Sequence, residues 1–262
     1  MVKKERHILG ISGGKDSSAL AIYMAQKFPE LDIEYFFTDT GEELPEVYDY
    51  LSKLEGYLGK QINRLNPDKD FKFYLKLFGY FLPSPQQRWC TQRLKLSPLE
   101  EWIKPDLERG IKITSYVAIR YDEQYREGHQ SSHEKFHVKL PFREDKIDRK
   151  GVYDLLNNSG LGVPDYYQWR SRSGCTFCFF QRKIEWVRLK ENHPKAFEYA
   201  KELEALSLEN GNGRAFTWAQ NESLVELEKP ERIKKIKEDH EIQRQRLLTK
   251  RKVNPLDPEE YL

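Results

Sequence analysis

The segment 12–17, SGGKDS, has the side chains and the backbone needed to bind phosphate. Its two glycines let the chain turn sharply, so that several N–H groups can point at one anion. Ser12 and Ser17 can donate hydroxyl hydrogen bonds, while Lys15 can neutralise phosphate charge. Asp16 can hold a Mg²⁺ ion bound by the same phosphates. The alternative is an ordinary strand-to-helix turn with Ser and Asp as caps.

Two successive strand-loop-helix units are predicted to position this segment. The apolar run 6–11 predicts a strand, and the apolar spacing in 17–28 predicts a helix. A second predicted strand, 33–39, is followed by a predicted helix over 45–59. Such alternation predicts a parallel sheet with right-handed crossovers, flanked by helices in a Rossmann-like α/β fold.

Further elements follow along the chain. Strands are predicted at 113–120 and 137–142, with a helix near 152–160, so the sheet has at least four strands. After Cys178 the pattern is helical. We expect one domain over 1–205 and a charged helical extension over 206–262. The remaining features are helices over 186–206, a loop at 210–214, a basic helix at 231–252 and a poorly ordered acidic tail at 253–262.

Composition predicts a folded protein of the cytoplasm. The chain has 262 residues, 33% of them charged, with 5 Trp, 15 Tyr and 14 Phe, which argues against disorder. No apolar run has the length of a membrane span, and the chain enters the glycine loop too early for a cleaved signal. The formal net charge of +2 neither requires nor excludes a nucleic-acid partner.

The string SGGKDS after a strand resembles the signature of the PP-loop ATP pyrophosphatases, whose fold is adenine nucleotide alpha hydrolase-like. It lacks the G-x-x-x-x-G-K-[ST] pattern of a Walker A loop. The resemblance implies that the loop grips the β and γ phosphates, which leave as pyrophosphate while AMP is transferred to an acceptor oxygen. Gly13, Gly14, Asp16 and Ser17 carry it most strongly.

Four further segments resemble motifs of the phosphoadenosine-phosphosulfate reductase branch of that family, in the same order. The resemblance runs from about residue 6 to 205, with Ala118 in place of the branch's glycine. The matching residues are Phe37-Thr38-Asp39-Thr40-Gly41 with Glu43, Pro45, Glu46 and Tyr50; Trp89-Cys90-Thr91 with Leu94, Lys95, Pro98 and Leu99; Ala118-Ile119-Arg120 with Glu123 and Arg126; and Gly174-Cys175-Thr176-Phe177-Cys178.

Three residues outside the loop are candidates for catalysis. Asp39 follows a strand's carboxyl end, where it can meet a ribose hydroxyl, Mg²⁺ or an acceptor, although a turn aspartate is the alternative. Arg120 can meet charge developing on the α phosphate, or form a surface ion pair with Asp122 or Glu123. Lys95 can bind the same α phosphate, although a solvated lysine is the alternative. The predicted catalytic residues are Asp16, Asp39, Lys95 and Arg120, and the predicted ATP-binding residues are Ser12, Gly13, Gly14, Lys15, Asp16, Ser17, Phe37, Thr38 and Gly41.

The three cysteines, Cys90, Cys175 and Cys178, are an odd number in a chain without an export signal, which favours a metal or redox role over disulfides. They can bind three irons of a [4Fe–4S] cluster and leave the fourth iron open for a sulfur ligand. A zinc site completed by His or Asp and plain buried thiols are the alternatives.

Among branches with this pattern, the chain most resembles the ATP pyrophosphatases of DNA phosphorothioation systems, of the DndC/SspD type. This resemblance implies ATP and Mg²⁺ as substrate, a DNA backbone phosphate as acceptor, and sulfur from a cysteine desulfurase. Other subunits of a modification complex, and a second copy in a homodimer, are the further expected partners. We expect no membrane association.

Two other functions stay open. A sulfonucleotide reductase is the first, although no cysteine follows Cys178 to act as the late nucleophile of the thioredoxin-dependent enzymes, and Trp89-Cys90 replaces the Cys-Cys pair of the cluster-bearing ones. A non-catalytic nucleotide-sensing subunit is the second.

Basic and aromatic residues surround the cysteines and fit a polyanionic acceptor. Core packing is the alternative for most of the aromatic rings. The basic residues are Arg88, Arg93, Lys95, Arg170, Arg172, Arg182 and Lys183, and the aromatic residues are Trp89, Trp169, Phe177, Phe179 and Phe180.

Overall fold

A computed structural model describes residues 4–126, 133–211 and 216–250. The expected loop at 210–214 lies partly outside these residues, and the expected tail at 253–262 lies wholly outside them. The chain forms two compact units, unit 1 with Met1–Asp68 and Gln92–Asp165, and unit 2 with Lys69–Thr91 and Tyr166–Leu262. Residue 205, the expected boundary, lies inside helix α9 (Pro194–Asn210) of unit 2.

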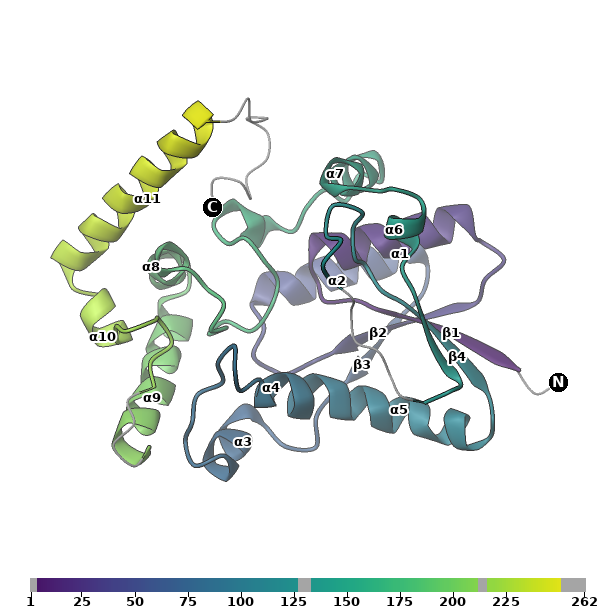
Figure 1. The fold of residues 1–262 in the computed structure, drawn as a ribbon, viewed down its shortest axis with the longest axis horizontal. Coiled ribbons are helices and arrows are strands. Elements are labelled where there is room, and N and C mark those ends of the chain that lie inside the picture. The colour runs from purple at the N-terminus through teal and green to yellow at the C-terminus, as the bar shows by residue number, and fades with distance from the viewer. Residues whose placement is uncertain (1–3, 127–132, 212–215, 251–262) are drawn as a thin grey trace. The chain divides into compact units, whose positions relative to one another are not determined.

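Unit 1 is built on a sheet of five parallel strands in the order β3-β2-β1-β4-β5 (Figure 1). Strand β1 is central, with β2 on one side and β4 on the other. Such a fold has a topological switch point between β1 and β4, where the connections leave in opposite directions. The strands are β1 (Glu5–Gly10), β2 (Ile33–Thr38), β3 (Ile62–Leu65), β4 (Lys112–Tyr116) and β5 (Phe136–Lys139).

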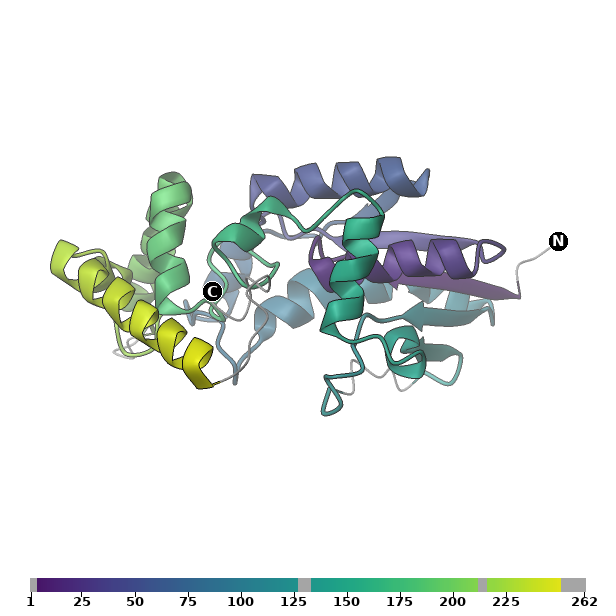
Figure 2. The ribbon, with the colours of Figure 1, turned by 90° about the horizontal axis from the view of Figure 1, so that it is seen from above.

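Helices cover both faces of this sheet. Helices α1 and α2 lie on one face with α7 packed against α1, and α5 lies on the other face (Figures 1 and 2). Under α5, Ile103 packs with Ile8, Phe36 and Ile113 of the sheet. The helices of unit 1 are α1 (Lys15–Lys27), α2 (Pro45–Leu58), the π-helix η1 (Gln92–Leu96), α5 (Ser97–Glu108), α6 (Pro141–Glu144) and α7 (Arg149–Asn158).

Two predicted strands are shorter than expected. Strand β4 ends at Tyr116 because the chain turns there, with the N–H of Ile119 bonded to the carbonyl of Val117 at 3.0 Å. Strand β5 ends at Lys139 because Pro141, which has no N–H to donate to a ladder, opens α6. Arg120 therefore lies in the loop after β4 rather than at the end of the strand.

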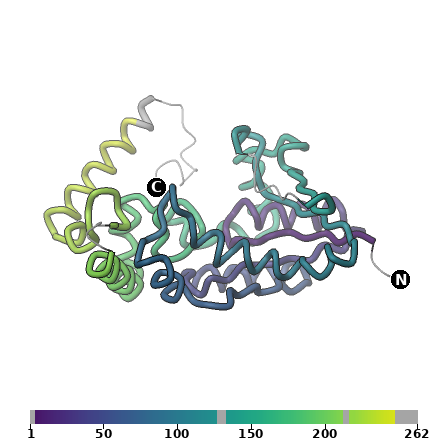
Figure 3. Tube along the Cα trace, turned by 60° about the horizontal axis from the view of Figure 1, so that its bottom comes forward, coloured from purple at the N-terminus to yellow at the C-terminus, as the bar shows by residue number. Residues whose placement is uncertain are grey.

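Unit 2 is helical, as expected for the chain after Cys178. Helix α8 packs against α9 and α11 (Figure 3). An aromatic core of Phe71, Phe177, Trp186 and Trp218 lies inside the unit. Within the described residues, no helix is long and apolar enough to cross a bilayer. The remaining elements are α3 (Phe71–Leu77), α4 (Trp89–Thr91), α8 (Lys183–Asn192), α10 (Leu224–Leu227) and α11 (Pro230–Lys250), with the 3₁₀-helix η2 (Asp165–Gln168) at the junction of the units.

Candidate functional site

The SGGKDS segment forms the turn between β1 and α1, at the carboxyl end of the central strand. The N–H of Ser12 donates to Oγ of Ser17 at 3.0 Å, and the N–H of Gly14 donates to Oγ of Ser12 at 3.3 Å. The two serine hydroxyls lie 3.1 Å apart. These bonds fix the turn so that α1 begins at Lys15 with its N-terminus beside the loop, where the helix dipole favours an anion.

Gly13 is required by both conformation and space. Its φ is 70°, in the left-handed region, and a Cβ at this position would lie 2.6 Å from Cγ1 of Val47 in α2. Only glycine avoids both the strain and the overlap.

Asp16 is the centre of a charged cluster that joins the loop to the segment after β4. Nζ of Lys15 donates to Oδ2 of Asp16 at 2.7 Å, and Nη1 of Arg120 donates to Oδ1 at 2.9 Å. Arg120 also donates through Nε to Asp122 at 2.9 Å. Two cations thus converge on one carboxylate at the switch point of the sheet.

Burial and charge act in opposite directions in this cluster. Burial would raise the pKa of Asp16, but the charges of Lys15 and Arg120 outweigh it and hold that pKa below its usual value. Burial would likewise lower the pKa of Arg120, but the hydrogen bond to Asp122 and the charge of Asp16 raise it. Asp16 and Arg120 are therefore both charged at neutral pH, with only 7% of Arg120 exposed.

A second group of polar residues follows β2. Oδ1 of Asp39 accepts from the N–H of Gly41 at 2.9 Å and from the hydroxyl of Tyr48 at 2.8 Å. Thr38 and Asp39 are partly exposed, whereas Phe37 is 3% exposed and packs its ring against Tyr48. The Phe37 side chain thus contributes to the core.

Glu43 is buried next to Asp39. The hydroxyl of Thr40 donates to its carboxylate at 2.9 Å, and the N–H of Glu42 donates to Oε2 at 3.2 Å. Burial raises the pKa of Glu43, and the charge of Lys95 in η1 lowers it only in part. Lys95 therefore lies within electrostatic reach of this acidic pair.

The structure brings Lys15, Asp16 and Arg120 into direct contact, and it places Asp39 and Lys95 around Glu43. Their catalytic roles stay predictions. Sequence reasoning did not assign a role to Glu43. It named Asp122 as an alternative ion-pair partner of Arg120, and the structure shows this pair at 2.9 Å. It did not foresee that the same arginine is largely buried and also contacts Asp16.

The three cysteines lie in unit 2, where they are partly exposed and form no disulfide with one another. Cys90 is in α4. Cys175 and Cys178 share a turn, in which the N–H of Cys178 donates to the carbonyl of Cys175 at 3.1 Å. Among residues 4–126, 133–211 and 216–250, no three His, Cys, Asp or Glu side chains are grouped to hold a metal. The described residues thus show no grouped donor set for the expected [4Fe–4S] cluster or zinc ion, and ligation of either by these cysteines stays a prediction. The alternative of buried thiols is not met, since all three are partly exposed.

The turn of Cys175 and Cys178 is held by a buried arginine. Arg170 has no exposed surface, and its guanidinium donates to the carbonyls of Gly174 at 3.2 Å and Cys175 at 2.6 Å. The side chain thus fixes the backbone of this turn.

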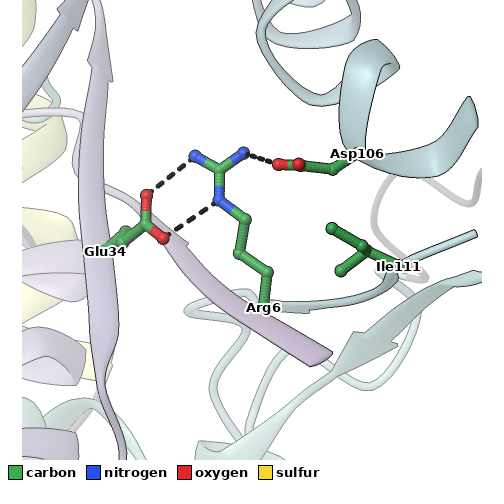
Figure 4. Close-up of a pocket in the computed structure, with 4 residues that line it drawn as sticks. All are labelled: Arg6, Glu34, Asp106 and Ile111. Atoms are coloured by element: carbon green, nitrogen blue, oxygen red, sulfur yellow. Dashed lines mark hydrogen bonds and ion pairs between the residues drawn. The ribbon is translucent and has the colours of Figure 1, made fainter. Parts of the chain in front are cut away.

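A polar hollow of about 340 Å³ lies at the amino end of β1, the end opposite the glycine loop (Figure 4). Its only cation, among the residues that line it, is Arg6, which donates to Glu34 at 2.8 Å and to Asp106 at 2.6 Å. The guanidinium also lies 3.9 Å from the centre of the Trp102 ring. Because Arg6 is neutralised by two carboxylates, this hollow is no candidate for binding an anion.

Comparisons with known proteins agree with this arrangement. The family described as the phosphoadenosine phosphosulfate reductase domain matches residues 6–128, a range that contains the glycine loop, Asp39, Lys95 and Arg120. The structure of phosphoadenylyl-sulfate reductase from Candida auris, in a phosphate complex, is similar with a TM-score of 0.51 and 13% identity, covering 65% of this chain and 81% of that one. The fold is therefore a Rossmann-like parallel sheet flanked by helices, similar to that of phosphoadenylyl-sulfate reductase.

Two uncharacterized proteins of Methanocaldococcus jannaschii are also similar. One is 28% identical over 201 residues, covering 74% of this chain and 40% of the relative, and the other is 30% identical over 198 residues, covering 71% and 44%. The chain thus spans less than half the length of these curated relatives. Cys175 and Cys178 lie beyond the range of the family match.

Proposed function

We propose that unit 1 binds ATP with Mg²⁺ at the loop 12–17 and cleaves it between the α and β phosphates. The observation that carries this proposal is the convergence of Lys15 and Arg120 on Asp16 at the N-terminus of α1. Paired cations at a helix N-terminus, on the carboxyl edge of a parallel sheet, form an environment suited to a phosphate group.

In the proposed complex, the phosphates of ATP replace Asp16 as the partner of Lys15 and Arg120. Charge-assisted hydrogen bonds from a guanidinium suit a phosphate at least as well as a carboxylate. The Asp16 carboxylate then becomes available to the Mg²⁺ ion that accompanies ATP and neutralises its phosphates.

The reaction proposed is transfer of AMP to an acceptor oxygen. The oxygen attacks the α phosphorus, the bond to the bridging oxygen of the β phosphate breaks, and pyrophosphate leaves with the electron pair. Arg120 stabilises the charge that develops on these oxygens, and Lys15 holds the departing pyrophosphate. Asp39, at the end of β2, receives a ribose hydroxyl or the acceptor.

The acceptor proposed is a backbone phosphate of DNA. The terminal sulfur of a persulfide, supplied by a cysteine desulfurase, then attacks the DNA phosphorus as the P–O bond to AMP breaks. A thiol reductant cleaves the S–S bond of the product, which leaves the phosphorothioate and releases a disulfide. Support for this finer assignment comes from the resemblance to subunits of DNA phosphorothioation systems. We also propose that the protein acts with other subunits of a modification complex and forms a homodimer.

The test is anaerobic incubation of the protein with ATP and Mg²⁺, alone and with DNA and the desulfurase, with separation of AMP and pyrophosphate from ADP and phosphate. Wild-type protein should release AMP and pyrophosphate, and Asp16→Asn should not. Asp32→Asn is the matched control, because Asp32 is an exposed aspartate that pairs with Lys60 at 3.0 Å and immediately precedes the amino end of β2, opposite the glycine loop. ADP as product, or no turnover under any of these conditions, would refute the proposal.

A sulfonucleotide reductase is the second candidate, favoured by the family match over residues 6–128. It predicts that adenylylated sulfate and a thiol reductant yield sulfite, while ATP is not cleaved. The same preparation therefore separates the two candidates.

A further inference from the structure

Phe180 is an exposed aromatic residue beside the Cys175–Cys178 turn. Its exposed fraction is 39%, whereas Phe177 and Trp169 in the same region are 1% and 9% exposed. Phe177 and Trp169 are therefore packed in the core, whereas the Phe180 ring is accessible at the surface. Phe180 leans on Phe179, with 4.4 Å between the ring centres, so the ring is held in place.

Two guanidinium groups lie over the Phe180 ring. The guanidinium carbon of Arg172 is 4.8 Å from the ring centre, and that of Arg88 is 5.5 Å away. Both side chains are exposed, and neither forms an ion pair with a carboxylate of the described residues. Cation–π contacts therefore position two positive charges around an exposed ring without neutralising them.

A second group of cations lies between α8 and α11. Nη2 of Arg188 lies 3.4 Å from Nε2 of His240, a hydrogen bond in which the guanidinium donates and the neutral imidazole accepts. Burial lowers the pKa of Arg188 and of His240, and the positive charges of Arg182 and Arg244 lower them further.

Nearby carboxylates offset this repulsion only in part. Glu185 pairs with Arg182 at 3.8 Å, and Glu241 pairs with Arg244 at 3.2 Å. Glu185 also accepts from Ser171, and the net effect still lowers the pKa of Arg188 and of His240. Clustered like charges destabilise a fold, and an anion bound between them removes that cost. The cluster is therefore suited to phosphate.

Arg182 connects the two groups. It follows Phe180 by two residues, immediately before α8, and its charge reaches both Arg188 and His240. All of these residues belong to unit 2. We call them the arginine-phenylalanine surface, which consists of Phe180, Arg88, Arg172, Arg182, Arg188 and Arg244.

We propose that the arginine-phenylalanine surface binds an unpaired strand of nucleic acid, with one base stacked on Phe180 and the adjoining phosphates bound by the arginines. A stacking ring needs the open face of a base, which a duplex does not offer. An acidic protein segment could pair with the arginines but would have no base to stack on Phe180. The choice of DNA as the strand rests on the proposed function, whereas the surface itself does not.

The experiment measures binding of a labelled single-stranded oligonucleotide by fluorescence anisotropy over a range of salt concentrations, without ATP. Phe180→Ala should weaken binding about tenfold and leave the salt dependence largely unchanged, because it removes the stacking ring and no charge. Arg188→Gln should weaken binding and reduce the slope of log K against log salt by about 0.7, the effect of one phosphate contact on a single strand.

Matched controls are available in the same unit. Phe73 is also an exposed phenylalanine, at 45%, with Lys69 5.8 Å from its ring centre, so Phe73→Ala should leave binding unchanged. Lys234→Gln removes one exposed positive charge from α11, the helix that carries Arg244, and should have little effect.

Competition identifies the ligand. Single-stranded DNA and RNA of one sequence should both displace the probe, and their relative affinities decide which strand is preferred. Displacement by duplex DNA or by polyglutamate as effectively as by single strands would overturn the proposal, as would wild-type binding by Phe180→Ala. Strand binding is measured without ATP, and AMP formation is measured in a separate assay with ATP. A failure of AMP formation with normal strand binding would count against the proposed function only. Normal AMP formation without strand binding would count against this surface only.

Discussion

Arg120 and Asp16 are 104 positions apart in the chain, and Nη1 of Arg120 donates to Oδ1 of Asp16 at 2.9 Å. The contact exists because β1 and β4 are neighbours in the sheet, so the loops that follow them meet at its carboxyl edge. Asp122 holds the other side of the guanidinium through two oxygens, at 2.9 and 3.1 Å. The arginine is therefore oriented towards the glycine loop before any phosphate arrives.

Arg120→Gln should lower kcat/KM for AMP formation about a hundredfold, the usual effect of losing one oriented donor to a developing negative charge. Its affinity for pyrophosphate, measured by calorimetry, should fall as well. Arg109→Gln is the matched control, because Arg109 is an exposed arginine that also pairs with an aspartate, Asp106. A wild-type rate in Arg120→Gln would show that Arg120 has a structural role only.

Gly13→Ala should impair both folding and nucleotide binding. The new Cβ meets Cγ1 of Val47 at 2.6 Å, in addition to the strain of a φ of 70°. Gly41→Ala is the matched control, since Gly41 has a φ of 75° but no heavy atom within 4 Å of a Cβ, and it should lose only about 1 kcal/mol from strain.

Denaturant unfolding of these variants separates strain from overlap. Gly13→Ala should lose more stability than Gly41→Ala, and adding Val47→Ala should restore part of the loss, so that the two changes are not additive. Equal losses in the two alanine variants would mean that α2 moves aside easily and that the contact with Val47 is unimportant.

Arg6→Gln should lower the free energy of unfolding by about 2 kcal/mol, because Glu34 and Asp106 lose a shared partner in a largely buried position. This loss of stability is smaller than for a fully buried ion pair, since the Glu34 side chain is 31% exposed. KM for ATP should not change, because Arg6 is at the amino end of β1. A changed KM with unchanged stability would contradict the assignment of this cluster to folding.

The first half of the sheet could be predicted from the sequence because its signals are local. The segments that form β1 and β2 each contain a short apolar run, end at glycine or polar residues, and are followed by helical spacing. Strand β3 was not predicted, because it has four residues, two of them polar, at the edge of the sheet. Such a short edge strand has little periodicity to detect.

The site could be predicted in its parts but not in its connections. The loop 12–17 is recognisable from its glycines, whereas the contact between Asp16 and Arg120 depends on the order of the strands, which alternation alone does not give. Unit 2 was not foreseen for a similar reason. Its segment Lys69–Thr91 is far in sequence from the helices with which it packs, and aromatic contacts such as Phe71 with Phe177, at 4.6 Å, hold them together.

Glu43→Gln should stabilise the protein at neutral pH. Burial raises the pKa of Glu43 above its ordinary value of 4.5, so the folded state binds this proton more tightly than the unfolded state does. The stability that Glu43 contributes is complete below the unfolded pKa and is lost as pH rises through the folded pKa. Gln is neutral at every pH, and its amide can donate to Thr40 and accept from the N–H of Glu42, the two groups that now bond the carboxylate.

Thermal unfolding of wild type and Glu43→Gln across pH 4 to 8 checks this sign, a range chosen about the ordinary carboxyl pKa. The advantage of the variant should appear as pH rises above 4.5 and vanish in acid. Asp16→Asn is a control in which stability should depend on pH in the opposite direction. The reason is that Lys15 and Arg120 lower the pKa of Asp16 against the effect of burial. Wild type should exceed that variant in stability at neutral pH, and the difference should shrink as pH falls. If the difference in stability between wild type and Glu43→Gln did not change with pH, Glu43 would have the same pKa in the folded and unfolded states. Lys95 would then offset the whole effect of burial.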